Sequence, residues 1–518
     1  MPNFSDLPLE IRLMVLEILT TGARDTEFVS TDRLATYAVV CKEWQSVLER
    51  ETFRQLILSP SRLQHLYRNV RYRRSFVKHV WYHVELQRYP CGACSIPETQ
   101  ARIKANNEIA TRAMYQLFEA LSRWKKDDAC AGDGLTLELS VHSPSDSKHY
   151  FQNHQFDTFF YSEDDDFDQN PKAQRLTQRR HDGQHRWENS VQSFQYHPTP
   201  DVLQHMNLVP RFRVHGQPLR IEKELPEAEI VTRLLVRRQS YRAFGPRALS
   251  YILRALPMLE QLHVESWRPL LPQLAGLEPV QDRKMEALFR LSMPIMLKAI
   301  TWYEDDDGIY ELLETNDHPT LPKLAAALLK ASTQLESLAI SFIADAQYFF
   351  MSLSSTKSPA LHTFPRLRFI ALTSNQLSLK TGTSLVNNLL STAGTAALRM
   401  PMLQIMELWN GRQGEAAIFR YEREPSIAIG TLVWISSWNF FPDVEVVAQW
   451  KEVALNHGCR RFLVESDRVS APPVCPGSIL KHLRLQRQIL HPISLYQIQR
   501  EAEDAADIQA WAAAYEIE

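Results

Sequence analysis

Cys91 and Cys94 have the spacing in this chain that most suggests metal chemistry. A Cys-x-x-Cys pair supplies two thiolates of a tetrahedral zinc site, which needs two further Cys or His ligands when it is structural. No second Cys-x-x-Cys and no close His pair follows this one. We therefore expect no metal at these cysteines.

Two other groups of polar residues have ligand-like spacing but a poor context. His181 and His185 lie four apart, yet Gly183 between them disfavours the helix that would bring them together. The run Glu163–Asp166 reads as a solvated acidic loop. The chain also lacks a Gly-x-Ser-x-Gly elbow, a phosphate-binding loop and His-Glu-x-x-His, and it has only 16 glycines. We expect a non-catalytic protein without cofactor or metal.

The first 60 residues carry the clearest positional signal. Pro8 suits the first turn of a helix, and Ser5 and Asp6 before it are capping residues. Two helical stripes of apolar residues follow, namely Ile11, Met14, Val15, Ile18 and Leu19, then Leu34, Tyr37, Cys41, Trp44 and Leu48. So short a segment cannot bury this surface alone, so it either packs on the rest of the chain or binds a partner.

The same residues resemble the F-box, the adaptor-binding helical module of cullin-type ubiquitin ligases. The resemblance covers about 55 residues, with a Leu-Pro-x-Glu-Ile opening at Leu7 and Val-Cys-Lys-x-Trp from Val40 to Trp44. Phe53 to Leu58 fits the closing turn of the motif, and the polar stretch Thr20 to Thr31 is a longer loop than a compact F-box has. This resemblance favours binding of a partner.

The resemblance implies a set of adaptor-binding residues. They would lie in the interface with a Skp-type adaptor or directly beneath it, with Trp44 more in the core than in contact. The set is Leu7, Pro8, Ile11, Val15, Leu16, Leu19, Val40 and Trp44.

Composition limits the remaining classes of protein. A chain of 518 residues is long enough for several domains or a repeat array, and 44% apolar with 23% charged residues is ordinary for a soluble protein. The net charge of −2 argues against nucleic-acid binding. We expect no export signal and no membrane span, because the apolar stretch 427–441 is too short. Six cysteines form no disulfide framework, which predicts a cytoplasmic or nuclear protein.

Beyond the first 60 residues, strand-like Leu-x-x-Leu units recur about 32 to 38 residues apart, several of them preceded by amphipathic helices. They begin at Leu259, Leu297, Leu335, Leu367 and Leu403, with weaker candidates at 76–86, 135–141, 231–238, 431–436 and 461–465. A strand plus a helix repeated in this way is typical of a solenoid, and the pattern resembles irregular leucine-rich repeats. A conventional α/β domain is the alternative.

We therefore predict a mixed α+β or α/β fold, a small helical F-box followed by an irregular leucine-rich-repeat-like solenoid with a long polar insertion. The predicted divisions are the F-box at 1–60, first strand-helix units at 61–142, a flexible insertion at 143–210, the repeat body at 211–505 and a tail at 506–518. Residues 205–505 also resemble a domain found behind F-boxes in filamentous-fungal proteins, through motifs such as Gln488–Pro492.

The resemblance implies the substrate-recognition subunit of a Skp-cullin-F-box (SCF) type E3 ubiquitin ligase, without catalysis of its own. An F-box scaffold or interaction protein that acts without ubiquitylation is the alternative, and an enzyme of unrecognised type would need a convergent set of ionisable residues in one cleft. The unidentified target protein would bind the repeat body, on outward strand positions or long loops. The outward positions by alternation are His263, Glu265, Trp267, Thr301, Tyr303, Ser341, Thr373 and Trp409.

Overall fold

The computed structural model describes the chain in fourteen segments. It covers residues 4–25, 31–93, 99–124, 134–148, 187–188, 191–192, 224–240, 244–267, 280–305, 322–354, 363–412, 414–469, 476–486 and 488–499. Most of the predicted insertion at 143–210 and the whole tail at 506–518 lie outside these residues. So do Cys94, His181, His185 and the run Glu163–Asp166.

The N-terminal segment is a small helical module. It contains η1 (Phe4–Asp6), α1 (Leu9–Asp25), α2 (Thr31–Tyr37) and α3 (Lys42–Thr52). The second predicted stripe is divided at Cys41, whose extended backbone (φ −160°, ψ 172°) precedes the first turn of α3. Leu16, Leu34 and Leu48 are fully buried. The module therefore has a core of its own.

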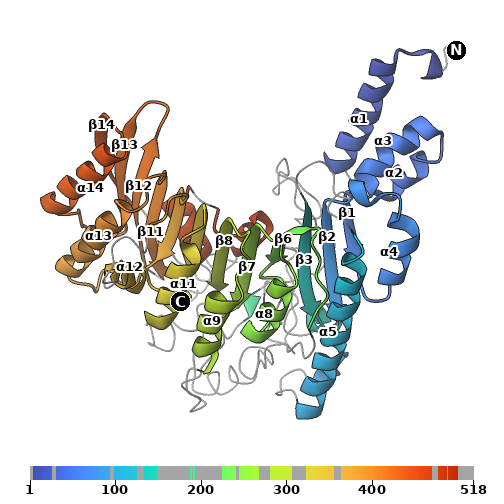
Figure 1. The fold of residues 1–518 in the computed structure, drawn as a ribbon, viewed down its shortest axis with the longest axis horizontal. Helices are drawn as coiled ribbons and strands as arrows, with labels where there is room; N and C mark the ends of the chain where they lie inside the picture. The colour runs from blue at the N-terminus through green and yellow to red at the C-terminus, as the bar shows by residue number, and fades with distance from the viewer. Residues whose placement is uncertain are drawn as a thin grey trace, which may run out of the picture.

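One open sheet of twelve strands forms the body (Figure 1). The strands are β1 (Gln55–Leu58), β2 (His79–Glu85), β3 (Leu135–His142), β6 (Val231–Val236), β7 (Gln261–Trp267), β8 (Ala299–Asp305), β9 (Ser337–Ser341), β10 (Phe369–Thr373), β11 (Ile405–Arg412), β12 (Glu415–Glu424), β13 (Ile429–Ser436) and β14 (Arg461–Arg468). They lie side by side in chain order, and every pairing is parallel except those that β12 makes with β11 and β13. A separate pair joins β4 (Trp187–Glu188) to β5 (Val191–Gln192).

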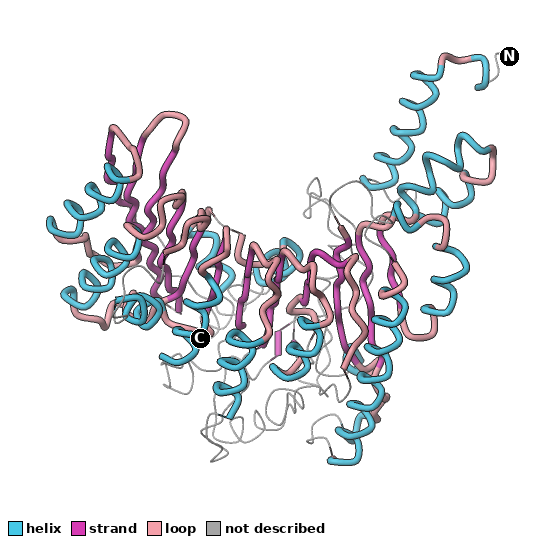
Figure 2. The backbone as a smooth tube through the Cα atoms, viewed as in Figure 1, coloured by secondary structure: helices cyan, strands magenta, loops and turns pink. Residues whose placement is uncertain are grey.

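Helices cover one face of the sheet, here called the helix face (Figure 2). They are α5 (Gln100–Leu121), α8 (Pro246–Arg254), α9 (Val280–Leu291), α11 (Pro322–Ser332), α12 (Ala346–Ser354), α13 (Thr383–Ala397) and α14 (Val444–Asn456). A further helix, α4 (Leu63–Val70), packs beside α5. The short turns near β2 and β3 are η2 (Arg74–Phe76), η3 (Cys91–Ala93) and η5 (Asp146–Lys148). Alternate strand residues such as Leu262, Ile300 and Leu338 fill the core beneath them.

The C-terminal segment, residues 476–486 and 488–499, packs on the opposite face of the sheet. It includes α15 (Pro476–Leu483), which contacts β11 and β12. Ile479, Leu483 and Leu490 form a second core with strand residues such as Tyr303 and Trp409. The same chain therefore covers both faces of the sheet over β8 to β12.

The predicted strand-helix alternation agrees with this mixed α/β architecture. The five Leu-x-x-Leu units correspond to β7 to β11, and α8, α11 and α13 precede three of them. Residues 55–58, predicted to close the helical module, instead form the edge strand β1 in parallel register with β2. The predicted loop from Thr20 is shorter than expected, because α1 continues to Asp25. No helix among the described residues is long and apolar enough to cross a bilayer.

Candidate functional site

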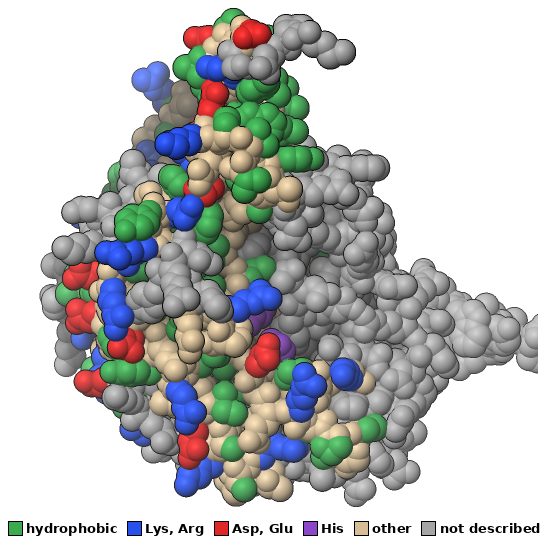
Figure 3. All heavy atoms as spheres, turned by 90° about the vertical axis from the view of Figure 1, so that its right-hand side faces the viewer, with side chains coloured by type: hydrophobic (Ala, Val, Ile, Leu, Met, Phe, Trp, Pro, Cys, Tyr) green, Lys and Arg blue, Asp and Glu red, His purple; other side chains and the backbone are tan. Residues whose placement is uncertain are grey.

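Apolar side chains gather on the surface of the N-terminal module (Figure 3). The most exposed on α1 are Met14 at 55% and Ile18 at 66%, and Val39 and Val40 in the turn before α3 are 82% and 62% exposed. We call Leu7, Leu9, Ile11, Met14, Ile18, Val39 and Val40 the N-terminal apolar patch. Isolated exposed apolar residues are common, but a group of this kind on one small module is typical of a binding surface.

The eight predicted adaptor-binding residues differ in how far their side chains are exposed. Leu7, Pro8, Ile11 and Val40 are exposed, and Val15, Leu19 and Trp44 are half-buried. Leu16 is completely buried and belongs to the core of the module. The indole of Trp44 contacts Phe4 and Tyr37 edge-on, with ring centroids 5.3 and 6.4 Å apart.

Four residues of the patch were absent from the predicted set. Leu9, Met14, Ile18 and Val39 are all exposed. For Met14 and Ile18 the sequence does carry a signal of an apolar surface, since both belong to the apolar stripe of α1. The exposure of Val39 depends on the break between α2 and α3 and has no periodic signal.

Ion pairs hold the module together and join it to the sheet. Arg12 on α1 lies 3.3 Å from Glu43 on α3. Glu49 on α3 accepts two hydrogen bonds from Arg73, at 2.8 and 2.6 Å, and Arg73 also lies over the Phe53 ring. The hydrogen bond from Arg73 lowers the pKa of Glu49. The patch is therefore presented from a fixed base beside β1 and β2.

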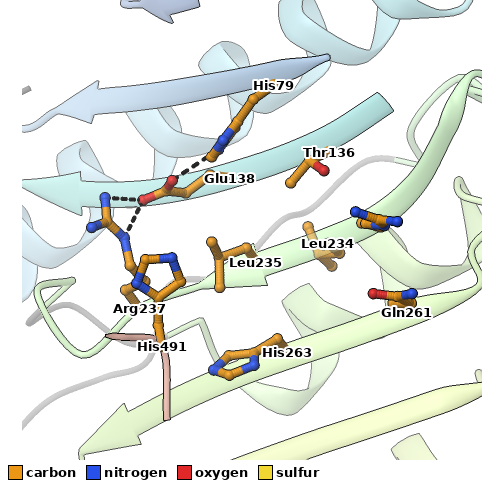
Figure 4. A pocket seen from close by; sticks show the side chains of 10 residues that line it. His79, Thr136, Glu138, Leu234, Leu235, Arg237, Gln261, His263 and His491 are labelled. Carbon is orange, nitrogen blue, oxygen red and sulfur yellow. Dashed lines mark hydrogen bonds and ion pairs between the residues drawn. The ribbon is translucent and has the colours of Figure 1, made fainter. Parts of the chain in front are cut away.

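A polar pocket of about 210 Å³ lies on the opposite face of the sheet (Figure 4). It crosses β2, β3, β6 and β7, and the C-terminal segment contributes one wall through His491. Its lining consists of His79, Thr136, Glu138, Arg233, Leu234, Leu235, Arg237, Gln261, His263 and His491. The histidines come from three separate parts of the chain.

Glu138 organises one side of the pocket. It pairs with the buried guanidinium of Arg237 and lies 3.0 Å from His79, as the dashed lines of Figure 4 show. Burial alone would raise the pKa of Glu138, but the charge of Arg237 and the hydrogen bond from His79 outweigh it and lower the pKa. Arg237 also stacks 4.3 Å from the Trp81 ring. This buried ion pair shapes the pocket wall.

Glu265 organises the other side and ties the C-terminal segment down. It receives hydrogen bonds from His263 at 2.9 Å and from the backbone N–H of His491 at 2.5 Å. Burial raises the pKa of Glu265, but these bonds and one from Ser494 overcome that effect and lower it. Burial beside Arg237 keeps the pKa of His491 well below its usual value. The ring is therefore neutral at pH 7.

The lining of this pocket combines polar and apolar side chains, as ligand-binding sites do. Its polar side chains are guanidinium, imidazole, amide and hydroxyl groups around an ion pair, and Leu234 and Leu235 lie beside them. Across the described part of the chain, no group of three or more His, Cys, Asp and Glu residues is arranged to hold a metal. Cys91 is partly exposed.

Most of the outward strand positions proposed for target binding are buried. His263 is half-buried at the pocket, and Trp267 ends β7. Of the others, Glu265, Thr301, Tyr303, Ser341, Thr373 and Trp409 are each 8% exposed or less. Alternation placed their side chains on the opposite face, but they do not form an accessible surface, in part because the C-terminal segment packs there.

Comparison with known proteins gives one match. Residues 292–491 match a family of unknown function (DUF6546). This part of the chain includes β8 to β14 and α15. Neither the curated proteins nor the solved structures include a match to this chain.

Proposed function

We propose that this chain is the substrate-recognition subunit of an SCF-type E3 ubiquitin ligase. The observation that carries the proposal is the N-terminal apolar patch, exposed on a helical module that resembles an F-box. A Skp-type adaptor would cover this patch by helix-in-groove packing, with a few apolar anchors providing most of the affinity. The adaptor in turn would link the chain to a cullin.

The body would hold the target protein. What supports an irregular leucine-rich-repeat-like solenoid is the chain order of the strands and the placement of the helices on one face. The pocket around His79 and His263 is an accessible polar hollow on the opposite face next to the C-terminal segment, so we place target contact there. In this proposal the chain acts by proximity in the cytoplasm or nucleus, and attached partners transfer ubiquitin.

The test is direct binding of the purified full chain to a purified Skp-type adaptor. Ile11→Ala combined with Val40→Ala removes two exposed anchors, and hot-spot losses of about 2 kcal/mol correspond to a roughly 30-fold higher Kd. Ile427→Ala is the matched control, because Ile427 is 63% exposed on the body. Circular dichroism verifies that each variant is folded.

Two outcomes would refute the proposal. If the wild-type chain fails to bind the adaptor, the function is wrong. If the double variant binds as tightly as the Ile427→Ala control, the patch is not the interface. An F-box scaffold without ligase activity would bind the adaptor equally well, and a reconstituted ubiquitylation assay on captured targets separates it.

A further inference from the structure

The last strand of the sheet, β14, is exposed along almost its whole length. Among the described strands it pairs with β13 alone, and it forms the edge of the sheet farthest from the N-terminal module (Figure 1). Leu463 and Val464 at its centre are each 38% exposed, and Phe462 alone packs partly into the core. An unprotected edge strand is a template for pairing with another strand.

The backbone of β14 presents a defined set of free groups. The N–H of Arg461 bonds to Ala428 and the N–H of Val469 bonds to Ser436, both on the β13 side. Because successive residues of a strand direct their N–H and C=O groups to alternate sides, the even-numbered residues face away from β13. Phe462, Val464 and Ser466 therefore direct their peptide groups out of the sheet edge.

We infer that β14 pairs with β14 of a second copy of this chain, antiparallel and centred on Val464. Two-fold symmetry then sets Val464 opposite Val464 and Phe462 opposite Ser466 as hydrogen-bonded pairs, joined by about six backbone hydrogen bonds. It also sets Arg461 opposite Asp467 and Leu463 opposite Glu465 as the closer, non-hydrogen-bonded pairs. In this register, the residues that form hydrogen-bonded pairs are therefore those whose peptide groups point out of the sheet edge.

Charge complementarity favours a second copy as the occupant. In this register both ends of the ribbon carry an Arg461–Asp467 pair, and opposite charges facing each other across strands are stabilising. The neighbouring symmetric register centred on Glu465 would set two glutamates face to face, which is unfavourable. The one centred on Leu463 would set Arg461 opposite Glu465, and the double charge reversal described below distinguishes it from the proposed register. Within one chain Asp467 accepts a 2.8 Å hydrogen bond from the backbone N–H of Arg468 and lies 4.0 Å from Arg484, and the side chains of Asp467 and Arg484 are both more than half exposed.

The position of β14 leaves the other surfaces of the chain accessible. The N-terminal apolar patch lies at the opposite end of the sheet from β14 (Figure 1). A dimer joined at β14 would carry two such patches at its far ends. The inference does not depend on the adaptor proposal, because it rests on the edge strand alone.

The test is the mass of the full chain in solution, measured by light scattering and sedimentation velocity over a concentration series. We expect a dimer that dissociates on dilution. Val464→Pro removes one outward N–H without touching a bond to β13, and should weaken the dimer at least about tenfold. Val464→Ala keeps that N–H and is the matched control, with a smaller loss.

Charge reversal tests the register. Arg461→Asp alone should weaken the dimer, and Arg461→Asp with Asp467→Arg should restore most of the affinity, because each pair is re-formed in reverse. A wild-type chain that stays monomeric up to about 100 μM overturns the inference. So does a dimer insensitive to Val464→Pro, and failure of the double reversal to restore affinity overturns the register.

Discussion

Ser494 donates a hydrogen bond of 2.5 Å to the buried carboxylate of Glu265, although the two residues are 229 positions apart. The backbone N–H of His491 serves the other carboxylate oxygen. A second glutamate, Glu407, is held in the same way by Arg420 and by the N–H of Gln486. Two strand carboxylates therefore fix the C-terminal segment to the opposite face.

The first prediction concerns this anchor. Ser494→Ala should lower the free energy of unfolding by about 1.5–3 kcal/mol, because a hydrogen bond to a buried charged group is lost. Ser426→Ala is the control, since Ser426 donates a similar 2.7 Å bond to Glu424 at an exposed site. It should cost less than about 0.5 kcal/mol. Urea unfolding measures both, and equal costs would contradict the anchoring role of Ser494.

The second prediction concerns the contact of α15 with β11. A Cβ added at Gly411 would lie 2.1 Å from Cγ2 of Ile479. Gly411→Ala should therefore displace α15 and cost about 1–3 kcal/mol of unfolding free energy. Gly92→Ala is the control, because nothing lies within 4 Å of the position of its added Cβ.

A double variant checks the cause of that loss. Ile479→Ala removes the atom that clashes, so Gly411→Ala should cost less in this background than in the wild-type chain. Strict additivity of the two costs in urea unfolding would show that Gly411 acts through something other than α15.

Sequence periodicity predicts the individual helices and strands. It does not predict contacts between segments that are far apart in the sequence. Leucines such as Leu335 and Leu367 marked the approach to β9 and β10, because a helix-facing strand alternates its apolar residues. Nothing in residues 476–499 indicates that they return to the sheet, since their anchors Glu265 and Glu407 lie far away in sequence. The burial of Trp409 followed from that return and could not be predicted.

The candidate site, too, could be predicted from the sequence only where a single helix or strand carries it. The apolar stripe of α1 could be predicted because one helix carries it. The pocket could not, since His79, His263 and His491 are brought together by the sheet and by the C-terminal segment. A single histidine in a sequence carries no signal of such a neighbour.

The third prediction is a pH dependence of stability. Burial, with the nearby His142, lowers the pKa of His83 to about 3. The ring is neutral beside Ser140, whose hydroxyl lies 2.9 Å from Nδ1. The unfolded chain therefore binds this proton first as pH falls, so the stabilisation is complete above about pH 6.5 and decreases below it. At pH 5 the loss from His83 amounts to about 2 kcal/mol.

His83→Asn removes the titrating group and keeps a hydrogen-bonding atom near Ser140. The difference in unfolding free energy between pH 7.5 and pH 5 should be smaller in this variant by about 2 kcal/mol. Urea unfolding at the two pH values measures it. A variant with the same pH difference as the wild-type chain would mean that folding does not shift the pKa of His83, so that the folded and unfolded chains bind this proton equally.

The last prediction concerns the ion pair that walls the pocket. Glu138→Gln leaves the Arg237 guanidinium, 3% exposed, as an uncompensated buried charge, and should cost about 3–5 kcal/mol of unfolding free energy. Glu119→Gln is the control, because Glu119 pairs with Arg123 at 3.0 Å on an exposed helix surface. It should cost no more than about 0.5 kcal/mol.

Replacing both partners separates the cost of an orphaned charge from the value of the pair. Glu138→Leu with Arg237→Met removes both charges, so it should be less destabilising than Glu138→Gln alone. Urea unfolding of the wild-type chain, the two single variants Glu138→Gln and Glu119→Gln, and the double variant gives the comparison. If the double replacement is the worse of the two, the pair itself stabilises the sheet. In that case the contacts of Glu138 with His79 and of Arg237 with the Trp81 ring contribute more than the desolvation of both charges costs.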